Sequence, residues 1–235
     1  MITRAVVAPV PPLLVPELVP GLVERTARVR DACLAAVQGL AATCPHWIAI
    51  GVAEHAVTVE PGARGSFRGF GVDVPVTLSA GMAPGEPADL PLPALLAGWL
   101  RERAGAESVR VELLPESTSV DRCIAAGERL AGLPDDVGLL VLGDGSTRHE
   151  TAPPGWPDER AAGFDATVAD AFADADPEPL LRLDAGLADE LGAGGRVPWQ
   201  VLAGLARARP PWRGKLCYSH APLGVAYHVA VWEQG

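Results

Sequence analysis

The stretch VGLLVL at residues 137–142, followed by Gly143-Asp144-Gly145-Ser146, is the most informative part of the chain about its class of fold. An uninterrupted apolar run of this length is typical of a strand that is buried on both faces, as in a parallel sheet. The two glycines after the run predict a sharp loop at the carboxyl end of the strand. In open α/β sheets ligands bind at that end of the strands, so this loop is the first place to search for functional side chains.

Outward from this strand, apolar runs alternate with segments of helical periodicity. The runs predict strands at residues 3–8, 47–52, 57–59, 72–78, 109–113, 137–142, 215–218 and 225–232. Apolar residues at three- and four-residue steps predict helices at residues 21–42, 91–103, 120–130, 158–174, 178–191 and 199–207. This alternation predicts one α/β domain over residues 1–235, with a central, largely parallel (mixed) sheet flanked by helices. The last two strands are expected to pair antiparallel.

Composition and charge exclude several classes of function. A chain of 235 residues with 49% apolar and 20% charged residues is globular and long enough for one substantial core. The formal net charge is −10 and no Lys/Arg-rich run occurs, which argues against a nucleic-acid partner. No uninterrupted apolar stretch of about 18 residues is present, and five prolines interrupt the apolar first 20 residues. We therefore expect a cytoplasmic protein without a membrane partner.

The cysteines indicate packing rather than chemistry. Cys33, Cys44, Cys123 and Cys217 form no C-x-x-C pair and match no zinc spacing. Cys33 and Cys123 fall on apolar faces of predicted helices, where a free thiol behaves as a small hydrophobic group.

Two histidines follow predicted strands and are candidates for a metal site. His55 comes after the strand at residues 47–52 and stands beside Glu54, whereas His149 lies five residues past Asp144. Carboxyl ends of parallel strands meet at one edge of a sheet, so the two histidines are expected near each other. Two histidines and a carboxylate are the ligand set of non-heme iron oxygenases. The alternative is that each is a surface or capping histidine; His228, within the last strand, is expected to alternate toward solvent.

Ser146 raises a different possibility. A metal-independent hydrolase or lyase could use Asp144, Ser146 and His149 as its catalytic residues. The local pattern G-D-G-S-T departs from the G-x-S-x-G of a nucleophile elbow, and two prolines at residues 153–154 interrupt any helix directly after it. The alternative stays open but has weak support from the motif.

Four segments together resemble a known family. They are APVPPLLVPEL (residues 8–18), IAIGVAEH (48–55), VLGDGSTRHETAPPGWPDERAAGFDATV (141–168) and LCYSHAPLGVAYHVAVW (216–232). In order and spacing they resemble the class III extradiol dioxygenase family. The resemblance implies an α/β fold, a homodimer, and a mononuclear Fe(II) held by two histidines and a glutamate. It also implies opening of a catechol-type ring, a small aromatic molecule, with O₂.

The chain departs from the family at several functional positions. Val10 stands where the family has its first metal histidine, and Thr147 stands where it has the proton-handling histidine. His55 matches the second metal histidine. No carboxylate lies in GAGGRVPWQ (residues 192–200), where the family places its glutamate, and Glu190 is the nearest.

Three interpretations follow. The first is an Fe(II)-dependent dioxygenase with a rearranged site, in which His55, Glu54 and Glu17 bind the metal and His149 acts as the base. The second is a pseudoenzyme of the same fold that binds a ligand or partner, with Val10 and apolar neighbours filling the metal position. The third is the hydrolase or lyase built on Asp144, Ser146 and His149.

Overall fold

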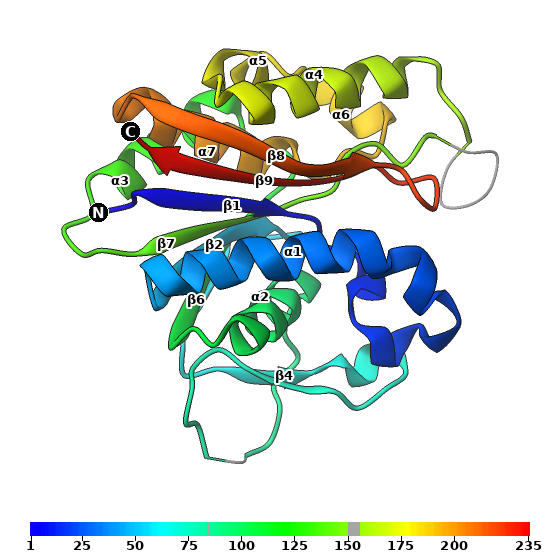
Figure 1. Ribbon diagram of the computed structural model, residues 1–235, viewed down its shortest axis with the longest axis vertical. Helices are drawn as coiled ribbons and strands as arrows, with labels where there is room; N and C mark the ends of the chain where they lie inside the picture. The colour runs from blue at the N-terminus through cyan, green and yellow to red at the C-terminus, as the bar shows by residue number, and fades with distance from the viewer. Residues whose placement is uncertain (84, 150–155) are drawn as a thin grey trace.

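The computed structural model describes residues 1–83, 85–149 and 156–235 and is built on a seven-stranded mixed sheet (Figure 1). The strand order is β3-β6-β2-β7-β1-β9-β8. The strands are β1 (Arg4–Ala8), β2 (His46–Val52), β3 (Val57–Val59), β6 (Ser108–Leu114), β7 (Gly138–Leu142), β8 (Trp212–His220) and β9 (Tyr227–Gln234). Strands β6, β2, β7 and β1 are parallel, whereas β3, β9 and β8 pair antiparallel. The predicted class of fold and the antiparallel final pair are confirmed.

Helices cover both faces of the sheet (Figure 1). One face packs against α1 (Val23–Thr43) and α2 (Leu92–Ala104). The other packs against α3 (Val120–Ala131), α4 (Arg160–Asp174) and α7 (Arg196–Ala208), with the short α5 (Pro177–Leu181) and α6 (Ala185–Glu190) beside them. In β1, Val6 and Ala8 face the α1 side while Ala5 and Val7 face the α4 side, which is the two-residue alternation of a strand buried on both faces. None of the helices in the described ranges is long and apolar enough to cross a membrane.

The proline-rich segment after β1 prevents a regular helix from starting at once. Three short 3₁₀ turns, η1 (Pro12–Leu14), η2 (Pro16–Leu18) and η3 (Pro20–Leu22), carry the chain from the end of β1 to α1, and each begins with proline. Proline fits the first position of a helical turn because its missing N–H would have no partner there. The segment therefore forms a rigid wall beside the carboxyl end of β1.

The chain reverses its direction across the sheet between β1 and β7. These two strands are neighbours and parallel, with Ala8 opposite Leu142 at their carboxyl ends. The next long helix after β1 is α1, on one face, whereas β7 is followed by α4 on the other face. In open α/β sheets a crevice forms where neighbouring strands send their connections to opposite faces. The fold thus places its natural binding crevice between the loops that follow β1 and β7.

Several predicted element bounds differ from the structure. The helix expected at residues 178–191 is two helices, α5 and α6, because Asp184 accepts a hydrogen bond from the Leu187 N–H and caps α6. The strand expected at residues 72–78 is the shorter β5 (Pro75–Thr77), which pairs with β4 (Arg64–Ser66) in a separate two-stranded sheet. The helix expected from residue 199 begins earlier, at Arg196.

Helices α3 and α7 lie unusually close together and run in the same direction. A Cβ built on Gly127 of α3 would lie 2.3 Å from the Val201 carbonyl oxygen, and one on Gly204 of α7 would lie 2.8 Å from the backbone of Ile124. At their amino ends, Arg196 donates to the carbonyl oxygen of Thr118. Since amino end contacts amino end, both helices start at the same place on the surface.

Candidate functional site

A cavity of about 430 Å³ occupies the crevice between the loops after β1 and β7, and we call it the switch-point cavity. Its walls come from both loops, from the start of α2 and from the chain leading into β9. The lining residues are Val10, Pro11, Pro12, Leu13, Leu92, Asp144, Thr147, Leu223, Val225 and Tyr227. A cleft with mostly apolar walls and few polar groups is the usual form of a small-molecule site.

Asp144 is the acidic group of this cavity. Its Oδ1 accepts a hydrogen bond of 2.7 Å from the Val10 N–H, which ties the loop after β7 to the loop after β1. Burial raises the pKa of Asp144 to about 7, because little else in this apolar setting stabilises the charge. Around neutral pH its carboxyl group therefore exchanges between a hydrogen-bond donor and an acceptor.

Tyr227 lines the same cavity and is 2% exposed. Burial, reinforced by the nearby Asp144, raises the pKa of its phenol above the ordinary value, so it stays neutral. Together Asp144 and Tyr227 give the cavity two hydrogen-bonding groups against apolar walls.

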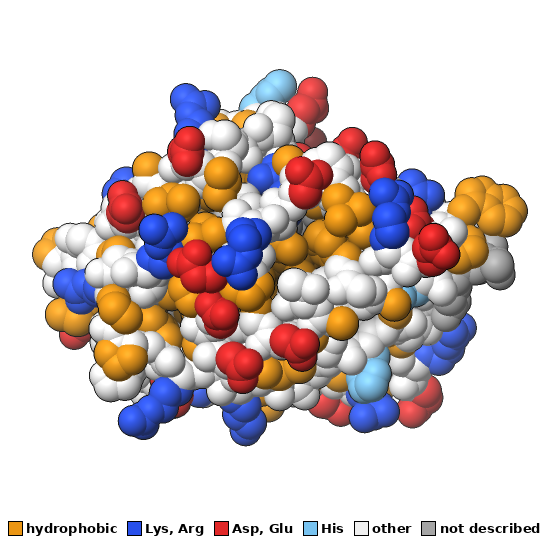
Figure 2. Space-filling view, turned by 90° about the horizontal axis from the view of Figure 1, so that it is seen from above, with side chains coloured by type: hydrophobic (Ala, Val, Ile, Leu, Met, Phe, Trp, Pro, Cys, Tyr) orange, Lys and Arg blue, Asp and Glu red, His pale blue; other side chains and the backbone are white. Residues whose placement is uncertain are grey.

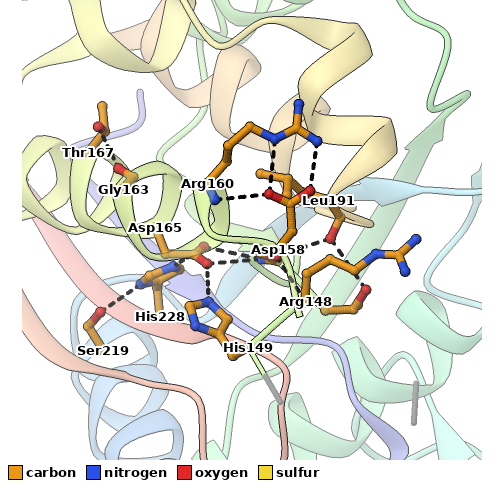
Figure 3. Close-up of polar contacts among 12 residues, drawn as sticks. Arg148, His149, Asp158, Arg160, Gly163, Asp165, Thr167, Leu191, Ser219 and His228 are labelled. Atoms are coloured by element: carbon orange, nitrogen blue, oxygen red, sulfur yellow. Dashed lines mark hydrogen bonds and ion pairs between the residues drawn. The ribbon is translucent and has the colours of Figure 1, made fainter. Parts of the chain in front are cut away.

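A second polar group lies on the other side of the loop 143–149, around the buried carboxylate of Asp165 on α4 (Figure 3). His149 Nε2 lies 2.6 Å from Asp165 Oδ2, and His228 Nε2 lies 3.2 Å from Asp165 Oδ1. The Ser146 N–H donates to both carboxylate oxygens at 3.2 and 3.3 Å, and Ser219 Oγ lies 3.0 Å from His228 Nδ1. We call these five residues the Asp165 cluster.

His228 corrects one sequence expectation. The prediction that it alternates toward solvent is wrong, because β9 lies inside the sheet and the histidine is 0% exposed beneath α4. Its ring meets those of Phe172 and Trp199 edge-on, with centroids 6.0 and 5.9 Å away. Its two nitrogens are occupied by Asp165 and Ser219, so it is a structural part of the core.

Asp165 is absent from the predicted site residues, although a signal for it exists in the sequence. Ala161, Val168 and Phe172 form the buried stripe of α4 at three- and four-residue steps, and Asp165 falls on that same stripe. An acidic residue on the apolar stripe of a helix requires buried polar partners. That pattern can be read from the sequence, but the partners, on the loop after β7 and on β9, cannot.

Ser146 and His149 are placed differently from a nucleophile and its base. The Ser146 hydroxyl is fully buried, donates to the Leu191 carbonyl oxygen at 3.1 Å and accepts from the Arg148 N–H at 3.1 Å. No hydrogen bond joins Ser146 to His149 in the ranges that the structure describes, and the carboxylate partner of His149 is Asp165 rather than Asp144. Ser146 therefore holds the loop 143–149 in shape.

The predicted iron ligands do not converge. His55 and Glu54 have side chains 85% and 90% exposed, with His55 Nε2 lying 3.7 Å from Glu54 Oε1. Glu17 pairs with Arg103 at 3.4 Å. Apart from residues 84 and 150–155, no group of three His, Cys, Asp or Glu side chains is arranged to hold a metal ion. These residues as placed do not fit Fe(II), no reaction step is derived through it, and the iron site stays a prediction.

Two family positions do meet in space. Val10 and Thr147, which stand at the positions of the family's first metal histidine and its proton-handling histidine, both line the switch-point cavity. The tertiary structure thus brings residues 137 positions apart in the chain to one site, and the groups found there are an isopropyl and a hydroxyl rather than two imidazoles.

The face over α4 and α5 carries interspersed acidic, basic and apolar side chains (Figure 2). No single sign of charge dominates that face. This distribution gives it no electrostatic footprint for a polyanion such as nucleic acid.

Fold and cavity together define a single-domain α/β protein with a ligand crevice at the switch point of a mostly parallel sheet. No family model and no curated protein matches the chain. A solved structure with a similar fold is that of the uncharacterized protein JW3007 from Escherichia coli K12. It shares 14% sequence identity, aligns over 99% of this chain and 100% of that chain, and gives a TM-score of 0.55. At that identity the likeness concerns the fold.

Proposed function

We propose that this protein binds a small aromatic molecule bearing a hydroxyl group in the switch-point cavity, without metal chemistry. The observation that carries the proposal is the replacement of two family histidines by Val10 and Thr147 in the wall of one apolar cavity. A protein that kept the crevice but lost those groups retains the means to bind a ring and lacks the imidazoles expected there.

The size and chemistry of the cavity support this ligand class. About 430 Å³ lies within the range of roughly 300–1,000 Å³ usual for small-molecule sites. Pro11, Leu13 and Val225 offer apolar surface to a ring, and Asp144 offers a hydrogen-bonding partner to its hydroxyl. A buried carboxyl with a pKa of about 7 can accept from a phenol when ionised and donate to it when neutral.

The iron-dependent ring opening that the family resemblance implies is the second candidate. It would require His55, Glu54 and Glu17, or a set drawn from other residues, to converge when the metal binds. The hydrolase or lyase alternative would require Ser146 to leave two hydrogen bonds. A homodimer and a cytoplasmic location belong to the proposal on the sequence alone.

The test is ligand-observed NMR of phenol and catechol with the full chain in EDTA. We expect saturation transfer to both molecules, and we expect Val10→Trp, which fills the cavity, to abolish it. The matched control is Val57→Trp, at a residue that is 41% exposed and outside the cavity. Absence of transfer to wild-type protein would overturn the proposal.

An anaerobic Fe(II) titration by calorimetry separates the two candidates. For the metal-free binding protein we expect no one-to-one binding in wild type and none in His55→Ala. Micromolar binding that is lost in His55→Ala, together with catechol transfer that needs Fe(II), would favour the dioxygenase instead.

A further inference from the structure

A second and larger cavity, of about 850 Å³, lies where α3 and α7 begin, and we call it the Arg196 cavity. It shares no lining residue with the switch-point cavity, so its function is independent of the proposed one. The groups that matter to its chemistry are Arg196 and Gln200 in its wall and Glu116, Arg182, Asp184 and Asp189 around its rim.

Arg196 is a buried cation without an acidic partner. The residue is 6% exposed and donates to the carbonyl oxygens of Thr118 and Glu116 and to Gln200 Oε1. A guanidinium carries five N–H groups, so two of them remain without an acceptor among the described residues. No carboxylate in the described ranges lies within 4.0 Å of it. A buried charge of this kind is costly unless a counter-ion reaches it.

The helix ends add to the same positive potential. Both α3 and α7 present their amino ends to the cavity, through Ser119 and Val120 and through Arg196 and Val197. The Ser119 side chain makes no capping hydrogen bond, which leaves the first-turn amides of α3 without that partner. The amino end of a helix carries a partial positive charge, and here two of them meet a cationic side chain. A negatively charged group in this part of the cavity would be stabilised by all three.

The rim has the opposite charge. Glu116, Asp184 and Asp189 contribute three carboxylates against the single guanidinium of Arg182. A multiply charged anion such as phosphate would be repelled there, whereas a ligand that also carries an ammonium group would be attracted. Between the two regions, the small apolar side chains of Ala188 and Val197 leave room for an aliphatic group.

We infer that the Arg196 cavity binds a small zwitterion of the amino-acid type, with its carboxylate on Arg196 and the helix ends and its ammonium group toward the acidic rim. The probe is L-leucine, titrated by calorimetry into the full chain. The comparison probes are 4-methylpentanoate, which lacks the amine, 3-methylbutylamine, which lacks the carboxylate, and inorganic phosphate. We expect leucine to bind at least about tenfold more tightly than each of the other three, since each loses a charge-assisted contact or adds repulsion.

Two variants test the placement of the carboxylate. Arg196→Met should weaken leucine binding about tenfold or more. Because that variant can lose stability, Ser119→Asp is the second: aspartate is a good N-cap, so the thermal midpoint should hold or rise, while its charge competes with the ligand carboxylate. Asp174→Asn, on α4 and outside the cavity, is the control. Leucine affinity unchanged in a folded Ser119→Asp, equal affinity for 4-methylpentanoate, tighter binding of phosphate, or no binding of leucine would each overturn the inference.

Discussion

Two aspartates on opposite sides of the loop 143–149 have opposite environments. Asp144 faces the switch-point cavity with one backbone hydrogen bond and apolar walls, and its pKa is raised to about 7. Asp165 is 6% exposed but contacts two imidazoles and a backbone N–H. Burial alone therefore does not decide the role of a carboxylate. A carboxylate with its acceptor sites filled holds elements together, whereas one with capacity left beside a cavity is available to a ligand.

The largest effect is expected from removing Asp165. Asp165→Ala leaves His149 and His228 without their carboxylate partner in the core, so the free energy of unfolding should fall by about 3 kcal/mol. Urea denaturation measures it, with the exposed Asp170→Ala on the same helix as control, for which we expect a change within about 0.5 kcal/mol. Similar losses in both variants would remove the distinction between the two aspartates.

The next effect is a pH dependence at Asp144. Its folded pKa lies above the ordinary value of 3.8, so the folded state retains the proton longer, and this contribution to stability is lost as pH rises from about 4 to about 7. Asp144→Asn cannot lose a proton. The stability of Asp144→Asn relative to wild type should therefore rise with pH in that window, by at most about 1.4 kcal/mol per pH unit.

Unfolding curves at pH 4, 5, 6 and 7 measure that slope, and Asp170→Asn controls for loss of a surface charge. A flat difference between Asp144→Asn and wild type would mean that water reaches the carboxyl group and that the cavity is not the apolar setting described.

A smaller effect is expected at the far end of the Asp165 cluster. Ser219→Ala removes the partner of His228 Nδ1, and the loss of one neutral hydrogen bond costs about 1 kcal/mol. Urea denaturation in parallel with Ser219→Thr, which keeps a hydroxyl, isolates that contact. If Ser219→Ala were neutral, His228 would owe its position to Asp165 and the surrounding rings alone.

The smallest effect is expected at His55. Its exposed side chain contacts only Glu54 among the described residues, so His55→Ala should change stability by less than about 0.5 kcal/mol in EDTA. Thermal unfolding repeated with Fe(II) extends the test. A midpoint that rises with Fe(II) in wild type but not in His55→Ala would show that this region, rather than either aspartate, is the functional one.

Local sequence patterns were enough to specify the class of fold and the place of the crevice. Buried runs such as residues 137–142 and the periodic apolar stripes between them specify strands and helices through local geometry, and the prolines after β1 specify a rigid loop. Boundaries were less certain where a cap intervenes, as at Asp184, because one side-chain hydrogen bond can divide a periodic segment.

Which residues share a site depended on tertiary packing. The insertion of β7 between β1 and β2 brings Val10 beside Asp144 and Thr147, and the burial of β9 turns His228 inward to Asp165. Packing likewise brings Arg196 to the turn before α3. Local periodicity carries no information about strand order or about which distant side chains meet, because those depend on how the helices pack on the two faces of the sheet.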